Sequence, residues 1–217
     1  MKTVLVAGGT VEDDFALAYQ KQQQFEYKIA VDGGMSFFYR NGQVPDLLVG
    51  DFDSAEKRML DYFTEKNISC ERHDPQKDAT DTELALCRAL ELGSTEIHIL
   101  GGTGTRLDHT LGNIRVLGLA LEKGVPCYLV NATNRIRLVA HEAVLQRKEQ
   151  YGRYVSILPF TTSLKGLTLR GFQYPLEQAV MEGYHALGVS NEILASQAVI
   201  TLEEGVAIVI ESKDAFR

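Results

Sequence analysis

The chain has 217 residues, 45% of them hydrophobic, which is enough for one large globular domain or two smaller ones. A formal net charge of −7 argues against a nucleic-acid partner, because binding to a phosphate backbone depends on clustered Lys and Arg. Three cysteines lie far apart, without the C-x-x-C spacing of a zinc site. No apolar run is long enough for a signal peptide or a bilayer span, so we expect a cytoplasmic protein with no membrane partner.

The N-terminal part alternates short β-rich runs with longer stretches of helical period, which is typical of βαβ units around a parallel sheet. The predicted strands cover residues 3–7, 27–31, 46–50, 68–72, 96–100 and 126–130. The predicted helices lie near residues 13–24, 34–40, 55–66, 81–92 and 109–123. This pattern predicts an α/β domain over residues 1–132 with a mostly parallel six-stranded sheet.

From about Asn134 the pattern changes to short β-rich runs separated by glycine and polar turns. Examples are "RIRLVA", "YVSILPF", "LKGLTLRGF", "SQAVITL" and "GVAIVIES". Strands spaced about 8 to 12 residues apart are typical of a sandwich or barrel. We therefore predict a second, all-β sandwich domain over residues 133–217.

Acidic residues follow several of the predicted strands: Asp32, Asp51, Asp53, Asp78 and Asp108. Ligands of an open parallel sheet bind outside the carboxyl ends of its strands, so these carboxylates are expected to share one crevice. Clustered carboxylates repel one another unless a cation lies between them, and ligand sets made of oxygen alone favour Mg²⁺. For "DFD" alone, a solvated turn before a helix is the competing interpretation.

The segment "KDATDTELAL", residues 77–86, combines a helix start with acidic residues. Thr80 and Glu83 have the spacing of a capping box, which predicts that a helix begins here. Asp78 and Asp81 then either complement the helix dipole or bind metal. Lys77 either contacts a phosphate or is simply exposed.

The segment "GGTGTRLDHT", residues 101–110, places a glycine loop between a strand and a helix, where backbone N–H groups can receive anionic oxygen. Arg106, Asp108 and His109 add a cation, a carboxylate and an imidazole. Neither this loop nor "AGGTVEDD", residues 7–14, has the glycine pattern of a Walker A or dinucleotide-binding loop. Taken alone, the loop is equally well explained as a plain turn.

Together, "VDGG", "PDLLVGDFDS", "KDATDTELAL", "GGTGTRLDHTLGN", "GFQYPL" and "GVSNE" occur in an order that resembles the thiamine pyrophosphokinase family. The resemblance spans nearly the whole chain. It implies that residues 1–132 bind ATP, that residues 133–217 bind thiamine, and that a homodimer has active sites between its subunits. The implied reaction transfers the terminal diphosphate of ATP to the hydroxyethyl oxygen of thiamine, giving AMP and thiamine diphosphate.

The resemblance also implies residue roles. Asp51, Asp53 and Asp81 would bind Mg²⁺ and, with Asp108, form the catalytic group. The ATP-binding residues would be Asp32, Lys77, Asp78, Thr103, Arg106, Asp108 and His109. Tyr174, Ser190 and Asn191 would contact thiamine. The family often has tryptophan at the position of Tyr174, whereas this chain has no tryptophan, and tyrosine stacks somewhat less strongly on a cation.

Two other functions remain open at this point. A diphosphokinase of another alcohol, such as a hydroxymethylpterin, would use the same acidic ATP site with a different acceptor pocket. The segments "GFQYPL" and "GVSNE" favour thiamine. A non-catalytic nucleotide or thiamine sensor would be expected to lose acidic ligands, and the matched ones are all present.

Overall fold

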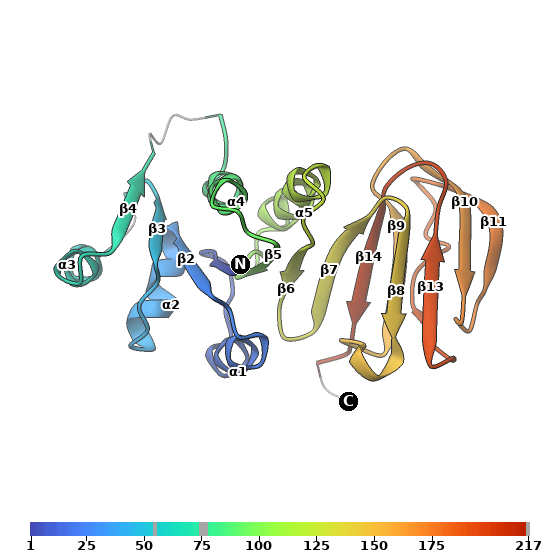
Figure 1. Ribbon diagram of the computed structural model, residues 1–217, viewed down its shortest axis with the longest axis horizontal. Coiled ribbons are helices and arrows are strands. Elements are labelled where there is room, and N and C mark those ends of the chain that lie inside the picture. Colours follow the sequence, from blue (N-terminus) through green and yellow to red (C-terminus); the bar gives the residue numbers. More distant parts are fainter. Residues whose placement is uncertain (54–55, 74–77, 216–217) are drawn as a thin grey trace. The chain divides into compact units, whose positions relative to one another are not determined.

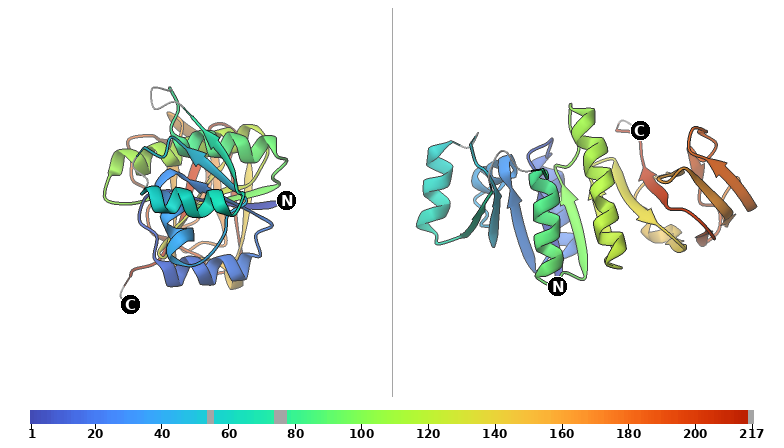
Figure 2. Two further views of the ribbon diagram at one scale, coloured as in Figure 1. Left: turned by 90° about the vertical axis from the view of Figure 1, so that its left-hand side faces the viewer. Right: turned by 90° about the horizontal axis from the view of Figure 1, so that it is seen from above.

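The structure is a computed structural model that describes residues 1–53, 56–73 and 78–215. The chain forms two compact units, Met1–Ala132 and Thr133–Arg217. Figures 1 and 2 show helices on both faces of the sheet in the first unit, and strands in the second. No helix in the described part of the chain is long and apolar enough to cross a membrane.

The first unit is built on six parallel strands in the order β6-β5-β1-β2-β3-β4. These strands are β1 (Lys2–Val6), β2 (Tyr27–Val31), β3 (Leu47–Gly50), β4 (Ser69–Arg72), β5 (Glu96–Leu100) and β6 (Cys127–Val130). The central strands are near-continuous runs of buried Val, Leu and Ile, as expected when helices cover both faces of a parallel sheet. All six strands and the fold class agree with the sequence prediction.

In the part of this unit that the structure describes, five α-helices connect the strands: α1 (Asp13–Gln23), α2 (Met35–Arg40), α3 (Lys57–Glu65), α4 (Asp81–Glu91) and α5 (Leu107–Glu122). A short 3₁₀ helix, Asp32–Gly34, precedes α2 and was not predicted. The predicted cap of α4 is present, since the Glu83 backbone N–H donates to Thr80 Oγ1 at 3.2 Å. That cap fixes where α4 begins and so positions Asp81 in its first turn.

The strand order reverses direction between β1 and β5. From β1 the chain adds β2, β3 and β4 on one side, then crosses to add β5 and β6 on the other. The two connections that leave β1 and β5 therefore diverge from adjacent strand ends. In open α/β sheets this switch point is where a crevice forms and ligands bind.

The second unit contains two antiparallel sheets, ordered β12-β9-β14-β7 and β11-β10-β13-β8. Their strands are β7 (Asn134–Val139), β8 (Glu142–Gln146), β9 (Tyr154–Pro159), β10 (Ser163–Arg170), β11 (Leu176–Glu182), β12 (Asn191–Glu192), β13 (Gln197–Thr201) and β14 (Ala207–Ser212). Both sheets contribute to one buried apolar cluster that includes Val155, Ile157, Leu167 and Ile200. This is the predicted β-sandwich.

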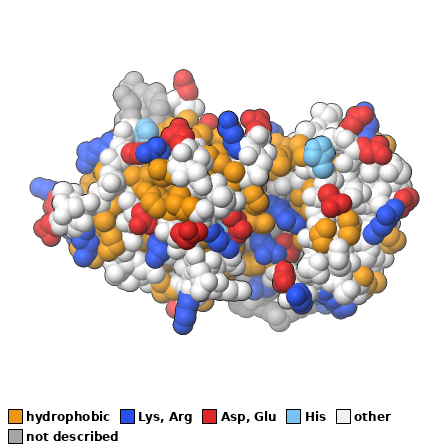
Figure 3. Space-filling model, in the orientation of Figure 1, with side chains coloured by type: hydrophobic (Ala, Val, Ile, Leu, Met, Phe, Trp, Pro, Cys, Tyr) orange, Lys and Arg blue, Asp and Glu red, His pale blue; other side chains and the backbone are white. Residues whose placement is uncertain are grey.

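Charged side chains are interspersed over the visible face of the molecule. Figure 3 shows Lys and Arg mixed with Asp and Glu there, with apolar atoms between them. The formal net charge of −7 thus arises from a small acidic excess among mixed charges.

Candidate active site at the switch point of the parallel sheet

Two glycine-rich loops leave the adjacent carboxyl ends of β1 and β5 and are joined through their backbones. The N–H groups of Ala7, Gly9 and Thr10 donate to the carbonyls of Leu100, Gly101 and Thr103, each at 2.8 Å. The pairing of β1 with β5 therefore continues into loops 7–10 and 101–104. The sequence prediction included the second loop and missed the first.

Glycine is required where these two loops meet. A Cβ atom on Gly9 would lie 2.4 Å from the carbonyl oxygen of Gly101 and 2.5 Å from that of Thr103. Gly101 has φ +67°, and a Cβ there would lie 2.3 Å from the Ala7 carbonyl oxygen. Side chains at these positions would force the loops apart.

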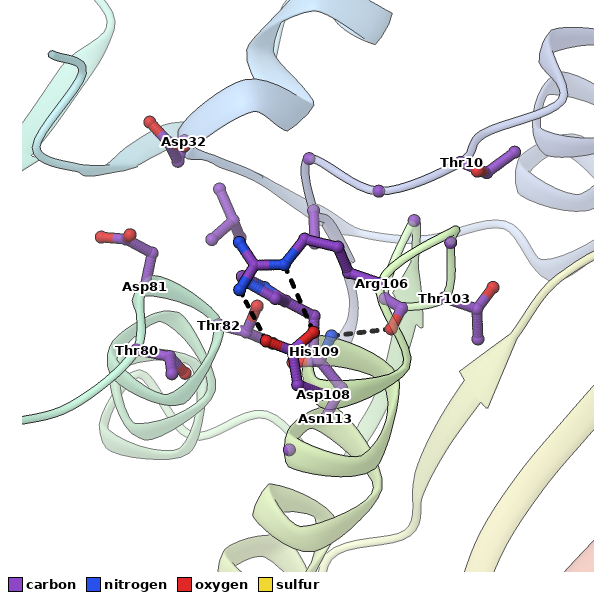
Figure 4. A pocket seen from close by; sticks show the side chains of 18 of the residues that line it. Thr10, Asp32, Thr80, Asp81, Thr82, Thr103, Arg106, Asp108, His109 and Asn113 are labelled. Carbon is purple, nitrogen blue, oxygen red and sulfur yellow. Dashed lines mark hydrogen bonds and ion pairs between the residues drawn. The ribbon is translucent and has the colours of Figure 1, made fainter. Parts of the chain in front are cut away.

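Asn113 supports the second loop from within α5. Its side chain is buried, and its Nδ2 donates to the Gly102 carbonyl at 2.7 Å (Figure 4). Asn131 Nδ2 donates to Thr103 Oγ1 at 3.0 Å. The loop thus has one partner on α5 and another just after β6, in addition to its bonds with loop 7–10.

These loops form one wall of a cavity of about 780 Å³. Asp32, after β2, and Asp51, after β3, contribute carboxylates, and Asp81 adds another from the first turn of α4. Figure 4 shows Asp32 and Asp81 on one side, Thr10 and Thr103 on the other, and the Arg106 side chain between them in this view. Carboxylates, a guanidinium and two glycine-rich loops therefore line one space, which suits a polyanion accompanied by a cation.

Arg106 and Asp108 form an ion pair at the start of α5. Arg106 Nη2 donates to Asp108 Oδ2 at 2.6 Å, and Nε contacts Oδ1 at 3.3 Å. The hydrogen bond from Arg106 lowers the pKa of Asp108 and raises that of Arg106. Both side chains are about two-thirds exposed, so the pair is screened and contributes little to folding. The guanidinium is therefore able to exchange Asp108 for an anionic ligand at small cost.

Most of the predicted nucleotide and metal residues line this cavity, although some do not. Those that line it are Asp32, Asp51, Asp81, Thr103, Arg106, Asp108 and His109. Asp53 and Asp78 are exposed and are not among the lining residues that the structure describes. The backbone N–H of Asp53 donates to Asp51 Oδ1 at 3.0 Å, which orients Asp51. Lys77 lies outside the described residues.

The carboxylates of the cavity suit an Mg²⁺ ion that is bound together with a phosphate ligand. Among the described residues, no three His, Cys, Asp or Glu side chains are gathered as a group that would hold a metal by themselves. Mg²⁺ usually keeps several waters and binds through one or two carboxylates together with substrate phosphates. Carboxylates spaced around a cavity large enough for a polyphosphate fit that mode better than an all-protein cage.

Several lining residues were not predicted from the sequence: Gly8, Gly9, Thr10, Thr82 and Asn113. Loop 7–10 lacks any standard phosphate-binding fingerprint, so its pattern alone did not identify it. A Gly-Gly pair directly after a buried strand, "VLVAGG", was the available signal. It becomes meaningful only once β1 is known to lie beside β5.

The three predicted thiamine-binding residues lie together in the second unit. Tyr174 is 63% exposed, whereas Asn191 is buried. The Tyr174 backbone N–H donates to Asn191 Oδ1 at 3.0 Å. Ser190 is exposed and adopts a left-handed backbone conformation with φ +59°, which is uncommon for a residue other than glycine.

Comparison with known families matches both units. Residues 19–129 match the family model described as "Thiamin pyrophosphokinase, catalytic domain". Residues 141–207 match "Thiamin pyrophosphokinase, vitamin B1 binding domain". The chain belongs to the thiamin pyrophosphokinase family. The expected family and the expected class of enzyme, a transferase, are confirmed.

Individual thiamin pyrophosphokinases resemble the chain over its whole length. It is 30% identical over 214 residues to the thiamine pyrophosphokinase of Bacillus subtilis (strain 168), covering 99% of this chain and 100% of the relative. A crystal structure of the enzyme from B. subtilis superposes with a TM-score of 0.88 at 31% identity, covering 99% and 100% of the two chains. The structure from Geobacillus thermodenitrificans gives 0.84 at 26% identity, covering 100% and 99%.

Proposed function

We propose that the chain transfers the terminal diphosphate of ATP to the hydroxyethyl oxygen of thiamine and releases AMP and thiamine diphosphate, with Mg²⁺ as cofactor. Membership of the thiamin pyrophosphokinase family fixes the class of reaction. The observation that supports the proposed donor is the cavity at the β1/β5 switch point, where two glycine loops face carboxylates and Arg106. The cytoplasmic location expected from the sequence stays a prediction.

Binding of the nucleotide is assigned to the first unit. The amides of loop 101–104 and the first turn of α5 would receive phosphate oxygens, since N–H groups at a helix start favour anions. Arg106 would leave Asp108 and bind phosphate through its planar guanidinium. Thr103 and His109 line the same cavity and would contact the nucleotide.

Asp51 and Asp81 are proposed to hold Mg²⁺, with Asp53 as the third predicted ligand. Asp32 and Asp78 would support them, and Lys77 would contact phosphate. When bound, Mg²⁺ would offset the negative charge of the polyphosphate and hold it in an extended position. Because Asp53 is exposed and its backbone already orients Asp51, its contribution would depend on movement of residues 51–53 toward the ligand.

Binding of thiamine is assigned to the second unit. The exposed Tyr174 ring offers a π face to the cationic heterocycle of thiamine. Ser190, which precedes Asn191 in the chain, offers a hydroxyl and a left-handed backbone. The strain of that backbone is typical of positions at functional sites.

A homodimer with active sites shared between subunits is part of the proposal. Exposed apolar side chains support it: Leu107 and Leu111 are 72% and 62% exposed on α5, and Tyr184 and Leu187 are 83% and 69% exposed in the second unit. Exposed apolar residues that gather in groups are typical of surfaces covered by a partner. A second copy of the chain would cover them.

The reaction would proceed by in-line substitution at the β-phosphorus. The thiamine hydroxyl oxygen forms the new P–O bond while the bond to the α,β-bridging oxygen breaks, and AMP leaves with that electron pair. The hydroxyl proton passes to an aspartate of the cavity. Arg106 and the loop amides would offset the charge that develops on the transferred oxygens.

Product analysis tests this function. Purified protein is incubated with ATP, Mg²⁺ and thiamine, and the products are separated by chromatography. AMP and thiamine diphosphate in equal amounts are expected. ADP with thiamine monophosphate would contradict the proposed transfer. Turnover with a hydroxymethylpterin in place of thiamine would contradict the acceptor, and absence of turnover with any alcohol would favour a sensor.

A further inference from the structure

The side chain of Asn191 is engaged with the backbone that carries Tyr174. Asn191 Oδ1 accepts the N–H of Tyr174 at 3.0 Å, and Asn191 Nδ2 donates to the Tyr174 carbonyl at 2.8 Å. Oδ1 also accepts the N–H of Glu192 at 2.9 Å. The amide therefore bonds both backbone groups of one residue 17 positions away.

Asn191 has little capacity left for a ligand. Its side chain is 5% exposed, and an amide oxygen that accepts two N–H groups has used both of its lone pairs. Only one N–H of Nδ2 lacks a bond that the described residues supply. Ser190, its exposed neighbour, is better placed to meet a ligand directly.

The segment that carries Asn191 is itself fixed to the sandwich. The backbone N–H of Ser190 donates to the buried Ser156 Oγ at 3.0 Å, and that of Ile157 donates to the Gly188 carbonyl at 2.8 Å. Asn191 then pairs with Val155 in the antiparallel ladder of β12 and β9. Because Asn191 is fixed in this ladder, the Tyr174 backbone that its side chain binds is held in place relative to the sheet.

Tyr174 is held at its backbone while its ring remains exposed. Pro175 follows it, which restricts Tyr174 to extended conformations. The preceding Gln173 N–H donates to the Glu192 carbonyl at 2.9 Å. A ring presented by a fixed backbone loses less conformational freedom when a ligand stacks on it than a ring on a mobile loop does.

We propose that Asn191 is a positioning residue: it does not touch thiamine, and it holds the Tyr174 backbone in place so that the exposed ring is presented for stacking on the acceptor's cationic ring. This inference rests on the proposed function, because it takes thiamine as the molecule that Tyr174 meets. It changes the role predicted for Asn191 from ligand contact to control of the residue beside it.

The kinetic test compares Asn191→Ala, Tyr174→Ala and the double variant. In Asn191→Ala the KM for thiamine is expected to rise about 5- to 30-fold, the range that corresponds to losing one or two buried hydrogen bonds. The kcat at saturating thiamine and the KM for ATP are expected to stay within about 2-fold, because the ATP site lies on other residues. In the Tyr174→Ala background, Asn191→Ala is expected to raise the KM for thiamine almost no further.

Asn191→Asp and Thr168→Val complete the design. An aspartate at position 191 retains the oxygen that accepts the Tyr174 N–H and lacks the N–H that donates to the Tyr174 carbonyl. The KM of Asn191→Asp for thiamine is therefore expected to rise as well. Thr168→Val is the matched control, because Thr168 is buried in the same unit and its Oγ1 accepts the backbone N–H of Gln178 at 3.1 Å. It is expected to lower thermal stability and to leave the KM for thiamine unchanged.

Amide hydrogen exchange separates the failure of this inference from failure of the proposed function. In the protein without ligands, exchange at the Tyr174 N–H is expected to quicken in Asn191→Ala and not in Thr168→Val. An unchanged KM for thiamine in Asn191→Ala would overturn the inference. If Asn191→Ala raised that KM equally in the wild type and in Tyr174→Ala, the inference would also fail, because the result would indicate direct contact between Asn191 and thiamine. If the wild type does not act on thiamine, the proposed function fails, and unaltered exchange at Tyr174 would still overturn the anchoring role.

Discussion

Replacing Asn113 by alanine tests whether loop 101–104 is held in a binding-ready position by α5. The variant loses the 2.7 Å bond from Nδ2 to the Gly102 carbonyl, at a site where the side chain is buried. Leaving a buried carbonyl without its partner costs about 1–3 kcal/mol. The melting temperature is therefore expected to fall by roughly 2–12 °C, at about 2–4 °C per kcal/mol for a chain of this size.

The same loss is expected to appear in nucleotide binding. If ATP must restore the loop before it binds, a cost of about 1–3 kcal/mol weakens binding about 5- to 150-fold. We expect the KM for ATP to rise within that range in steady-state assays, and the KM for thiamine to change little. Isothermal titration with an ATP analogue would report the same shift without turnover.

Asn41→Ala is the matched control for Asn113→Ala. Asn41 Nδ2 donates to the Phe37 carbonyl at 2.9 Å in the same unit, and Asn41 does not line the cavity among the residues described. It is expected to lower the melting temperature and to leave the KM for ATP unchanged. The reasoning would be refuted if both variants raised the KM for ATP equally, or if Asn113→Ala lost stability and kept the wild-type KM.

Three further predictions concern the loops, the carboxylates and pH. Gly9→Ala is expected to lower kcat/KM for ATP at least about 10-fold, because its Cβ would lie 2.4 Å from the Gly101 carbonyl oxygen and displace the loop; wild-type kinetics would contradict this. Asp51→Asn and Asp53→Asn are expected to abolish turnover with unchanged circular dichroism, and full activity in either would remove that residue from the proposed metal ligands. The hydrogen bond from His98 lowers the pKa of Glu96 from 4.5 to about 2 in the folded protein. The ionised Glu96 therefore stabilises the fold fully above its unfolded pKa, and this stabilisation is lost as the pH falls through its folded pKa. Between about pH 4.5 and 2 the free energy of unfolding is therefore expected to fall more steeply in the wild type than in Glu96→Gln, measured by urea titration, and equal slopes would contradict the assignment.

The parallel sheet could be predicted from the sequence because its strands are short runs of buried apolar residues separated by helical repeats. In the second unit, β8, β11 and the two-residue β12 were not among the strands named from the sequence. In β11 only Met181 is buried, and Glu177, Gln178 and Val180 are exposed, so the strand has no clear alternation of apolar and polar residues. Pairing with β10 makes it a strand, and that pairing is tertiary information.

The candidate site was partly predictable for a similar reason. Asp32, Asp51 and Asp108 follow strands, and the rule that ligands bind at the carboxyl ends of parallel strands predicts that these residues share one crevice. Loop 7–10 was missed because its role depends on β1 lying beside β5, an order that the sequence pattern does not specify. The hydrogen bonds from the Asn191 side chain to the Tyr174 backbone join residues 17 positions apart, and no sequence motif predicts them.

A crystal structure with Mg²⁺ and a non-hydrolysable ATP analogue tests the central claim most directly. We predict density for the polyphosphate between loop 101–104 and Arg106, with the metal against Asp51 and Asp81. A nucleotide bound elsewhere on the chain, with this cavity left without phosphate or metal, would contradict the account.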